Sequence, residues 1–207
     1  MRARPLILTG SVVALVGLLA ACGTSTSSAP TTTGSAAAAT ASVGGGMMNA
    51  GMGSTDDIAF AQLMIPHHQQ AIEMADLALA QASSPDVLTL ATQIKGAQDP
   101  EISMMGQWLS AWGAPMVMES DHSGHDMGGM MSSGMMSDDD MSDLAFASGG
   151  DFDQMWLRMM IAHHEGAIEM AKQVHAATTN PAVRDLAQAV IDGQTAEIDT
   201  MQKLMSP

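Results

Sequence analysis

The sequence predicts an all-α protein, an antiparallel four-helix bundle made of two duplicated helical hairpins. Three observations predict this class. The chain repeats itself at an offset of 96 residues, the repeated segments carry apolar residues at helical spacing, and short turn signals divide each repeat in two. A chain of 207 residues has room for one such domain with appended segments.

The internal repeat is strong enough to be seen in the single sequence. The best match pairs MIPHHQQAIEMA, which begins at Met64, with MIAHHEGAIEMA, which begins at Met160. Over the 53 positions from Asp57 to Leu109, 19 residues are identical to those 96 positions later. Chance does not give that agreement, so we expect residues 55–112 and 151–207 to form two similar hairpins.

The first helix of each hairpin is predicted by one apolar seam, whose members recur at alternating spacings of four and three. Asp56 and Asp57 come just before it, where a helix N-terminus favours negative charge. The seam in the first hairpin is Phe60, Met64, His67, Ala71, Met74 and Ala78, and its copy is Trp156, Met160, His163, Ala167, Met170 and Val174.

The second helix of each hairpin begins with a capping residue followed by proline, Ser84-Pro85 in the first and Asn180-Pro181 in the second. Apolar residues then follow at helical spacing. They are Val87, Leu90, Ala91, Ile94, Met105 and Leu109, with Val183, Leu186, Ala187, Val190, Met201 and Met205 as their copies. Two such hairpins can bury their seams against each other, which gives the predicted bundle.

The N-terminus has the pattern of an export signal. Arg2 and Arg4 precede an apolar run from Leu6 to Ala20, which is shorter than the ~20 residues of a membrane span. The run ends in Leu-Ala-Ala-Cys, which resembles the lipobox of bacterial lipoproteins. We therefore expect residues 1–21 to be removed and Cys22 to carry lipid, the alternative being an ordinary signal peptide with a chance Cys. Residues 22–54, rich in Gly, Ala, Ser and Thr, are expected to form a disordered tether.

The charge and the cysteine count exclude several classes of partner and site. The chain has 22 acidic and 7 basic residues, a formal charge of −15, and removal of the two arginines in residues 1–21 makes it 22 against 5, or −17. Such acidity argues against nucleic acid or an anionic lipid surface as partner. One Cys excludes a disulfide framework or a multi-thiolate metal site.

We expect a protein held by lipid on the outer face of the cell membrane, or on the periplasmic side of an outer membrane.

Residues 113–150 form the predicted linker between the hairpins, which is too long for an ordinary helix–helix loop of ~2–8 residues. Its methionines stand among Gly, Ser and Asp, with no periodic apolar face that would bury them. Thioether and imidazole are good ligands for Cu(I) and Ag(I), so a soft-metal site is favoured over an incidental low-complexity tract. The candidate ligands are Met116, Met118, His122, His125, Met127, Met130, Met131, Met135 and Met136.

The paired histidines are the candidate ligands within the helices. Adjacent helical residues lie ~100° apart, so one His of each pair can face the seam and the other a neighbouring helix. A hydrogen-bonded core His among packed methionines is the alternative, but duplication of the same pattern favours ligation. The predicted set is Met64, His67, His68 and Met74, with Met160, His163, His164 and Met170.

Four polar residues interrupt the apolar faces of the second helices. They are Gln98, Glu101, Gln194 and Glu197. Because a metal-bound imidazole commonly donates its other N–H to a carboxylate or amide oxygen, we expect these four to support the His side chains. A solvated flank is the alternative.

These motifs resemble bacterial domain-of-unknown-function family 305. The resemblance rests on the Met-Ile-x-His-His-x-x-Ala-Ile-Glu-Met-Ala pattern, present twice, and covers roughly residues 55–207. It implies a ferritin-like bundle and, since some members are periplasmic copper-binding proteins, copper as the ligand. By this resemblance, the eight Met and His residues named above are the positions of the family motif.

We therefore predict a lipid-anchored protein outside the cytoplasm that sequesters or transfers Cu(I), and Ag(I) in the same way, and that is not an enzyme. The predicted ligand is copper, with iron and haem less favoured. A copper donor or acceptor protein and a second copy of the chain are compatible partners.

Three alternatives remain open from the sequence. A di-iron or di-manganese oxidase could use one Glu from each helix, namely Glu73, Glu101, Glu169 and Glu197, although the Glu-x-x-His spacing of such bundles is missing. A b-type haem protein could use His and Met as axial ligands. The third alternative is a structural or partner-binding lipoprotein that holds no metal.

Overall fold

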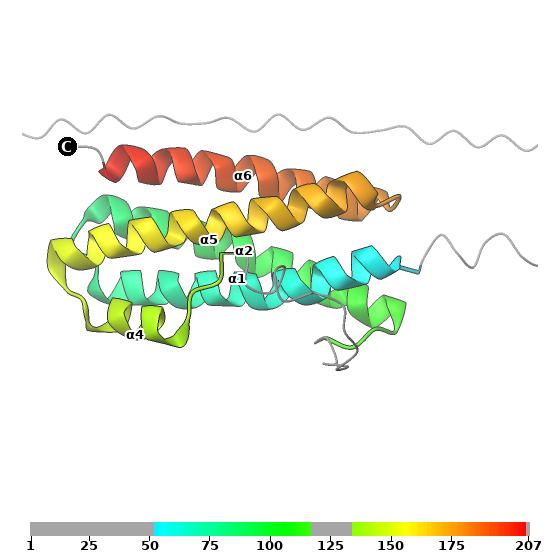
Figure 1. The fold of residues 1–207 in the computed structure, drawn as a ribbon, viewed down its shortest axis with the longest axis horizontal. Coiled ribbons are helices and arrows are strands. Elements are labelled where there is room, and N and C mark those ends of the chain that lie inside the picture. Colours follow the sequence, from blue (N-terminus) through cyan, green and yellow to red (C-terminus); the bar gives the residue numbers. More distant parts are fainter. Residues whose placement is uncertain (1–51, 117–133, 206–207) are drawn as a thin grey trace, which may run out of the picture. The chain divides into compact units, whose positions relative to one another are not determined.

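The structure is a computed structural model that describes residues 52–116 and 134–205 (Figure 1). Within these two ranges the chain forms α-helices and no β-strand, which confirms the prediction of an all-α protein. The long helices are α1 (Thr55–Gln81), α2 (Pro85–Trp112), α5 (Gly149–Ala177) and α6 (Pro181–Met205). A short helix, α4 (Asp138–Phe146), precedes α5.

The helix ends follow from local sequence. Ser54 caps α1 through a capping box, in which its hydroxyl accepts from the Asp57 backbone N–H at 3.1 Å and the Asp57 carboxylate accepts from the Ser54 backbone N–H at 2.9 Å. Pro85 and Pro181 open α2 and α6, as predicted, because a first-turn residue needs no N–H partner. Gly113 ends α2 in the left-handed conformation, with φ of 68°.

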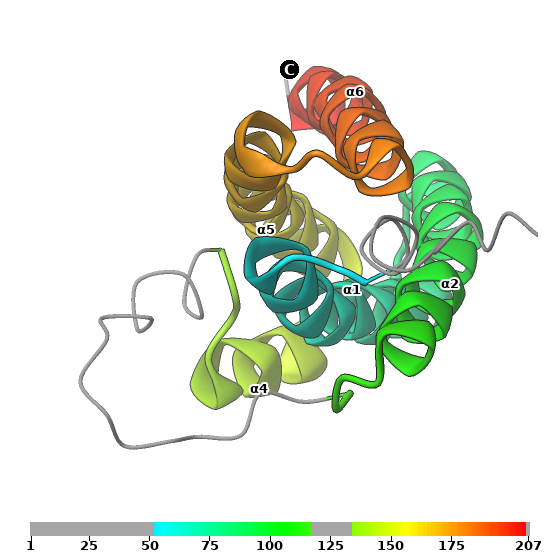
Figure 2. The same ribbon diagram turned by 90° about the vertical axis from the view of Figure 1, so that its right-hand side faces the viewer.

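The long helices pair as two hairpins, α1 with α2 and α5 with α6, and the hairpins meet mainly through α1 and α5 (Figure 2). Two sets of hydrogen bonds also join the hairpins. The Trp156 indole N–H donates to the Met74 carbonyl oxygen at 2.8 Å. The Asp153 carboxylate accepts from the backbone N–H groups of Ser83 and Ser84 and from the Ser83 hydroxyl, at 2.5 to 3.0 Å. Ser84 was expected to cap α2 with its side chain, but it instead donates its backbone N–H to Asp153.

Two apolar clusters fill the interior, one toward each end of the α1–α5 contact. Cluster 1 contains Phe60 and Met64 of α1 with Met170 and Val174 of α5, and cluster 2 contains Met74 and Ala78 of α1 with Phe152, Trp156 and Met160 of α5. The N-terminal half of α1 thus packs with the C-terminal half of α5, and the reverse holds at the other end. The two repeated helices therefore run in opposite directions.

The C-terminal part of the predicted linker is regular and packed, which differs from our expectation for residues 113–150. Three aspartates open α4 behind a Ser137 capping box, and Leu144 is completely buried in cluster 2. Met136 and Met141 are partly buried against the same cluster. Our prediction that this segment has no apolar face is therefore wrong for the stretch from Met136 to Leu144. The second hairpin begins at Gly149, two residues before the predicted start at residue 151.

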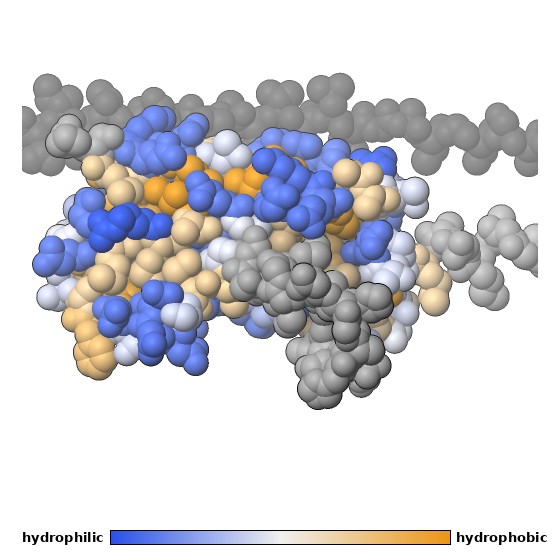
Figure 3. All heavy atoms as spheres, viewed as in Figure 1, coloured by the Kyte–Doolittle hydropathy of each residue, from blue (hydrophilic) through white to orange (hydrophobic). Residues whose placement is uncertain are grey.

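The predicted signal segment 1–21, Cys22 and most of the predicted tether lie outside the described residues. Of the tether, residues 52–54 are described, and Ser54 belongs to the cap of α1. Over residues 52–116 and 134–205, no helix has the length and apolar character needed to span a membrane. On the face in Figure 3, hydrophilic side chains cover much of α6 and apolar ones gather between α5 and α6.

Candidate metal centre

The four histidines of the two motifs are all buried, and they lie near the middle of α1 and α5, between the two apolar clusters. The rings of His67 and His163 are in contact, with centroids 3.8 Å apart and planes inclined by 42°. These two rings join the hairpins, because one comes from α1 and the other from α5. The centroid separation of His163 and His164 is 6.4 Å.

The outer histidine of each pair faces the second helix of its own hairpin. His68 Nε2 lies 2.7 Å from Glu101 Oε2, and His164 Nε2 lies 2.8 Å from Glu197 Oε2. An ionised carboxylate can only accept, so the proton belongs on Nε2 in both rings. This leaves Nδ1 of His68 and of His164 buried without a hydrogen-bond partner, and in a neutral ring that nitrogen carries a lone pair suited to a metal ion.

His163 differs from the other three imidazoles in that both of its ring nitrogens are buried without a hydrogen bond of normal geometry. Burial lowers the pKa of His163 well below its ordinary value of 6.5, the imidazoles of His67, His164 and His68 lower it further, and a backbone interaction with His67 opposes these effects only in part. The ring is therefore neutral at physiological pH, and neutral imidazole is the form that ligates metals.

The methionines of the motifs flank this imidazole contact on both sides. Met64 and Met170 belong to cluster 1, whereas Met74 and Met160 belong to cluster 2, and all four are buried. Each side of the centre therefore has one thioether from each hairpin. Thioether and imidazole together form a soft ligand set, which suits Cu(I) or Ag(I) better than a hard cation.

The arrangement of the rings limits how they can bind an ion. A metal–nitrogen bond is ~2 Å long, so an ion cannot lie between two rings whose centroids are 3.8 Å apart. An ion held by both His67 and His163 would require the rings to turn away from each other. Among residues 52–116 and 134–205, no group of three or more His, Cys, Asp or Glu side chains is arranged to hold a metal ion. The four imidazoles of the predicted set are therefore not gathered around one point in this arrangement, and the other four members of the set are thioethers.

The supporting side chains divide into two groups. Glu101 and Glu197 contact imidazoles as described above. Gln98 and Gln194 are also buried, but the structure shows no hydrogen bond between either amide and a histidine, and the two line a small pocket beside the glutamates. The carboxylates required for a di-metal oxidase are not gathered at this centre, because Glu73 and Glu169 are exposed.

The end of the linker lies directly against the histidine motif. The Gln70 side chain clamps the backbone of Met136 through two hydrogen bonds of 2.8 Å, one donated and one accepted. Gly134, with φ of 76°, lies so close to α5 that a Cβ there would come within 2.7 Å of the Ala162 carbonyl oxygen and 2.9 Å of that of His163. Gly166 leaves room for this approach, since its Cα is also a neighbour.

Sequence reasoning missed these docking residues. The available signal was a difference between the repeats: Gln70 aligns with Gly166 at the offset of 96, so the two motifs diverge where the linker crosses them.

Among the predicted linker ligands, Met135 and Met136 lie in this docked end and Met116 is half exposed after α2. Met118, His122, His125, Met127, Met130 and Met131 lie outside the described residues.

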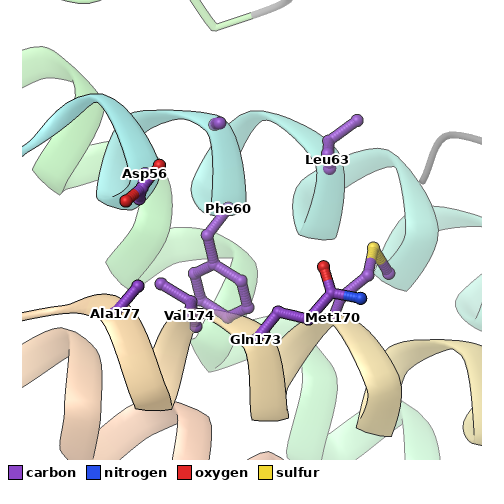
Figure 4. Close-up of a pocket in the computed structure, with 8 residues that line it drawn as sticks. Asp56, Phe60, Leu63, Met170, Gln173, Val174 and Ala177 are labelled. Atoms are coloured by element: carbon purple, nitrogen blue, oxygen red, sulfur yellow. The ribbon is translucent and has the colours of Figure 1, made fainter. Parts of the chain in front are cut away.

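A pocket of about 230 Å³ lies between the N-terminal half of α1 and the C-terminal half of α5 (Figure 4). Phe60 and Leu63 line it from α1, and Met170 and Val174 line it from α5, with the Asp56 carboxylate near one end. The pocket therefore brings one of the motif methionines, Met170, to the wall of a cavity.

These features define an all-α protein with paired buried imidazoles flanked by thioethers. The chain belongs to the DUF305 family, described as a domain of unknown function, whose sequence pattern matches residues 57–205. This confirms the family resemblance stated from the motifs.

Solved structures of the same family are similar to the chain. A DUF305 protein from Streptomyces coelicolor, described as putatively secreted, is 32% identical with a TM-score of 0.66, covering 72% of this chain and 89% of that one. A DUF305 fragment from Deinococcus radiodurans is 28% identical, with a TM-score of 0.64 and coverage of 74% and 97%.

The copper protein CopM is also similar. In its Cu(II)-bound form it is 35% identical, with a TM-score of 0.61 and coverage of 72% of this chain and 95% of that one. CopM also has solved Cu(I)-bound and Ag-bound forms. No curated protein sequence matches the chain.

The depressed pKa of His163 predicts that metal-free protein loses stability as the pH falls below about 6.5. Below that value the unfolded chain binds a proton at His163 while the folded chain does not. The neutral ring therefore contributes its full share of the free energy of unfolding above the ordinary pKa. This share declines as the pH falls toward the folded-state pKa. Urea denaturation at about pH 7.5 and about pH 5.5, with a chelator present, measures this change in the free energy of unfolding.

The variant His163→Leu should lose the part of this pH dependence that His163 causes. The remaining part should persist, because the carboxylates that also titrate are unchanged. His175→Leu, near the C-terminal end of α5, is the matched control and should keep the wild-type dependence. An identical pH dependence in His163→Leu and wild type would contradict the assignment.

Proposed function

We propose that this chain binds Cu(I), and Ag(I) in the same way, and sequesters or transfers it outside the cytoplasm without catalysing a reaction. The observation that carries the proposal is the contact between His67 and His163, which are buried and flanked on each side by thioethers from both hairpins, together with the neutral state of His163. Such a centre offers soft donors in a site closed to bulk water. Ordinary core packing does not need a buried imidazole such as His163, whose two ring nitrogens make no hydrogen bond of normal geometry.

The similarity to CopM supports this ligand, since CopM has Cu(I)-, Cu(II)- and Ag-bound forms. We extend copper and silver binding to this chain on the basis of its own Met and His residues. The four histidines and the four methionines of the motifs are the proposed ligands, and Glu101 and Glu197 are proposed to orient His68 and His164 so that Nδ1 of each ring can bind the ion. Binding would turn the two contacting rings apart, because the present spacing admits no ion between them.

The proposed setting is a ferritin-like antiparallel four-helix bundle, exported and anchored by lipid at Cys22. The similarity to a Streptomyces coelicolor protein described as putatively secreted supports the location. Lipid anchoring rests on the sequence motif around Cys22. The acidic charge of the chain would raise the local concentration of cations near this surface.

The linker is proposed to act as a low-affinity collector that feeds the buried centre. Its docked end supports this idea, because Gly134 lies against the backbone of His163 and Met136 is held by Gln70, three residues from His67. Ligands tethered so near a site raise the effective concentration of any ion they hold. Residues 134–146 also pack on the hairpins, so a test of the collector should delete only residues 117–133.

Replacement of both contacting histidines should abolish the tight Cu(I) site. We expect His67→Leu/His163→Leu to weaken the tightest binding by at least about a hundredfold, since two donors are lost while bulk is retained. Anaerobic titration of Cu(I) against a strong chelator measures this, in a chain with Cys22→Ser so that no free thiol competes. His175→Leu is the control. Unchanged affinity in the double variant would remove the imidazole centre from this account.

The same titration separates ligation by Met from packing by Met. Met64→Leu/Met170→Leu conserves volume and should cost little stability. A loss of Cu(I) affinity in this folded variant identifies the thioethers as ligands, whereas wild-type affinity assigns them to the core.

The docked linker end predicts how fast the centre is loaded. Gly134→Ala should displace the linker from α5, because the added methyl meets the carbonyl oxygens of Ala162 and His163 and the backbone has positive φ. We expect the tight site to keep its affinity but to load about fivefold more slowly or worse, as measured by stopped-flow transfer from a coloured Cu(I) complex.

The control for this experiment is Gly150→Ala, since a Cβ at Gly150 meets no atom within 4 Å. It should load at the wild-type rate. If Gly134→Ala also loads at the wild-type rate, docking of the linker does not serve delivery.

A further inference from the structure

A second polar site lies between α2 and α6, the helices that do not carry the paired histidines. Figure 2 shows these two helices side by side. It is a pocket of about 30 Å³. Its polar lining is duplicated like the two hairpins, since Gln98 and Glu101 of α2 align with Gln194 and Glu197 of α6 at the offset of 96. The rest of the lining is small or apolar, namely Ala97, Ala189, Val190 and Gly193.

The two glutamines in this pocket are buried without partners. Gln98 is 2% exposed and neither of its amide atoms has a hydrogen-bond partner; Gln194 is 4% exposed and its amide oxygen has none. Burying an amide in this way is unfavourable, so such groups normally have a protein or bound partner. Because both side chains line the pocket, a ligand held there could provide that partner.

The two glutamates supply charge to the same pocket. Each uses one carboxylate oxygen, Oε2, on an imidazole, and each is about one-fifth exposed. Oε1 of each side chain is therefore left for another ligand. None of the eight residues that line the pocket is basic, so the lining has no cation of its own to balance the two carboxylates.

We propose that this pocket is a second cation site, separate from the imidazole–thioether centre, for a hard divalent cation such as Mg²⁺, Ca²⁺ or Mn²⁺. Its donors would be the carboxylate oxygens of Glu101 and Glu197 and the amide oxygens of Gln98 and Gln194. Oxygen donors suit hard cations, whereas the buried centre offers nitrogen and sulfur. The volume exceeds the ~10–15 Å³ that one water needs, so an ion can keep part of its hydration shell.

This proposal does not depend on copper binding, but it connects the two sites. The cation would bind the free oxygen of the same carboxylates that accept hydrogen bonds from His68 and His164. Occupation of the pocket would thus hold the glutamates that orient those rings.

The experiment is a Mn²⁺ titration of the full metal-free chain with Cys22→Ser, followed by loss of the electron paramagnetic resonance signal of aqueous Mn²⁺. A salt concentration of about 0.15 M screens the acidic surface. We expect a saturable Mn²⁺ site that Mg²⁺ or Ca²⁺ displaces. Gln98→Leu/Gln194→Leu removes two donors at nearly constant volume, and we expect it to weaken this site at least about tenfold.

The matched control is Gln107→Leu/Gln188→Leu, which changes exposed glutamines of the same two helices and should bind Mn²⁺ like wild type. A second variant avoids any change in the interior. Gly193→Lys adds a positive charge at the pocket, where a Cβ meets no atom within 4 Å, and should also displace Mn²⁺. Gly96→Lys, an equally open glycine outside the pocket lining, is its control.

The proposal is overturned if the wild-type chain holds no saturable Mn²⁺. It is also overturned if Gly193→Lys binds Mn²⁺ as tightly as Gly96→Lys. Either result would leave the Cu(I) measurements untouched, because those concern other donors.

Discussion

Four imidazoles buried at the crossing of α1 and α5 impose the main constraint on this structure. Buried polar rings are costly unless they remain neutral and find partners. His68 and His164 each have a carboxylate from the second helix of their own hairpin, which fixes how α2 and α6 lie against α1 and α5. The other two rings contact each other and fix where the hairpins meet.

The apolar clusters follow from the same constraint. They lie on either side of the imidazoles and bury aromatic and aliphatic groups from both hairpins, which offsets the cost of the polar centre. Trp156 and Asp153 add hydrogen-bonded ties between the hairpins. A rigid surround of this kind would hold soft donors near one another before an ion arrives, which reduces the ordering cost of binding.

Much of this could be predicted from sequence because the decisive signals are local and repeated. Helical period located the seams, proline located the starts of α2 and α6, and the repeated Glu101 and Glu197 indicated partners for histidine. The docking of Met136 on Gln70 could not be predicted, because those residues are 66 positions apart and no periodic pattern links them. The short helix α4 was missed for a related reason: nine residues form a marginal helix alone, and this one depends on the burial of Leu144. The ring contact depends on side-chain rotamers, which spacing does not determine.

The central claim is that imidazole and thioether from both hairpins hold one Cu(I) ion together. X-ray absorption of the chain lacking residues 117–133, with Cys22→Ser and loaded with one equivalent of Cu(I), tests it most directly. The account predicts sulfur in the first coordination shell together with the outer-shell scattering typical of imidazole rings. Sulfur without imidazole, or light-atom ligands without sulfur, would contradict it.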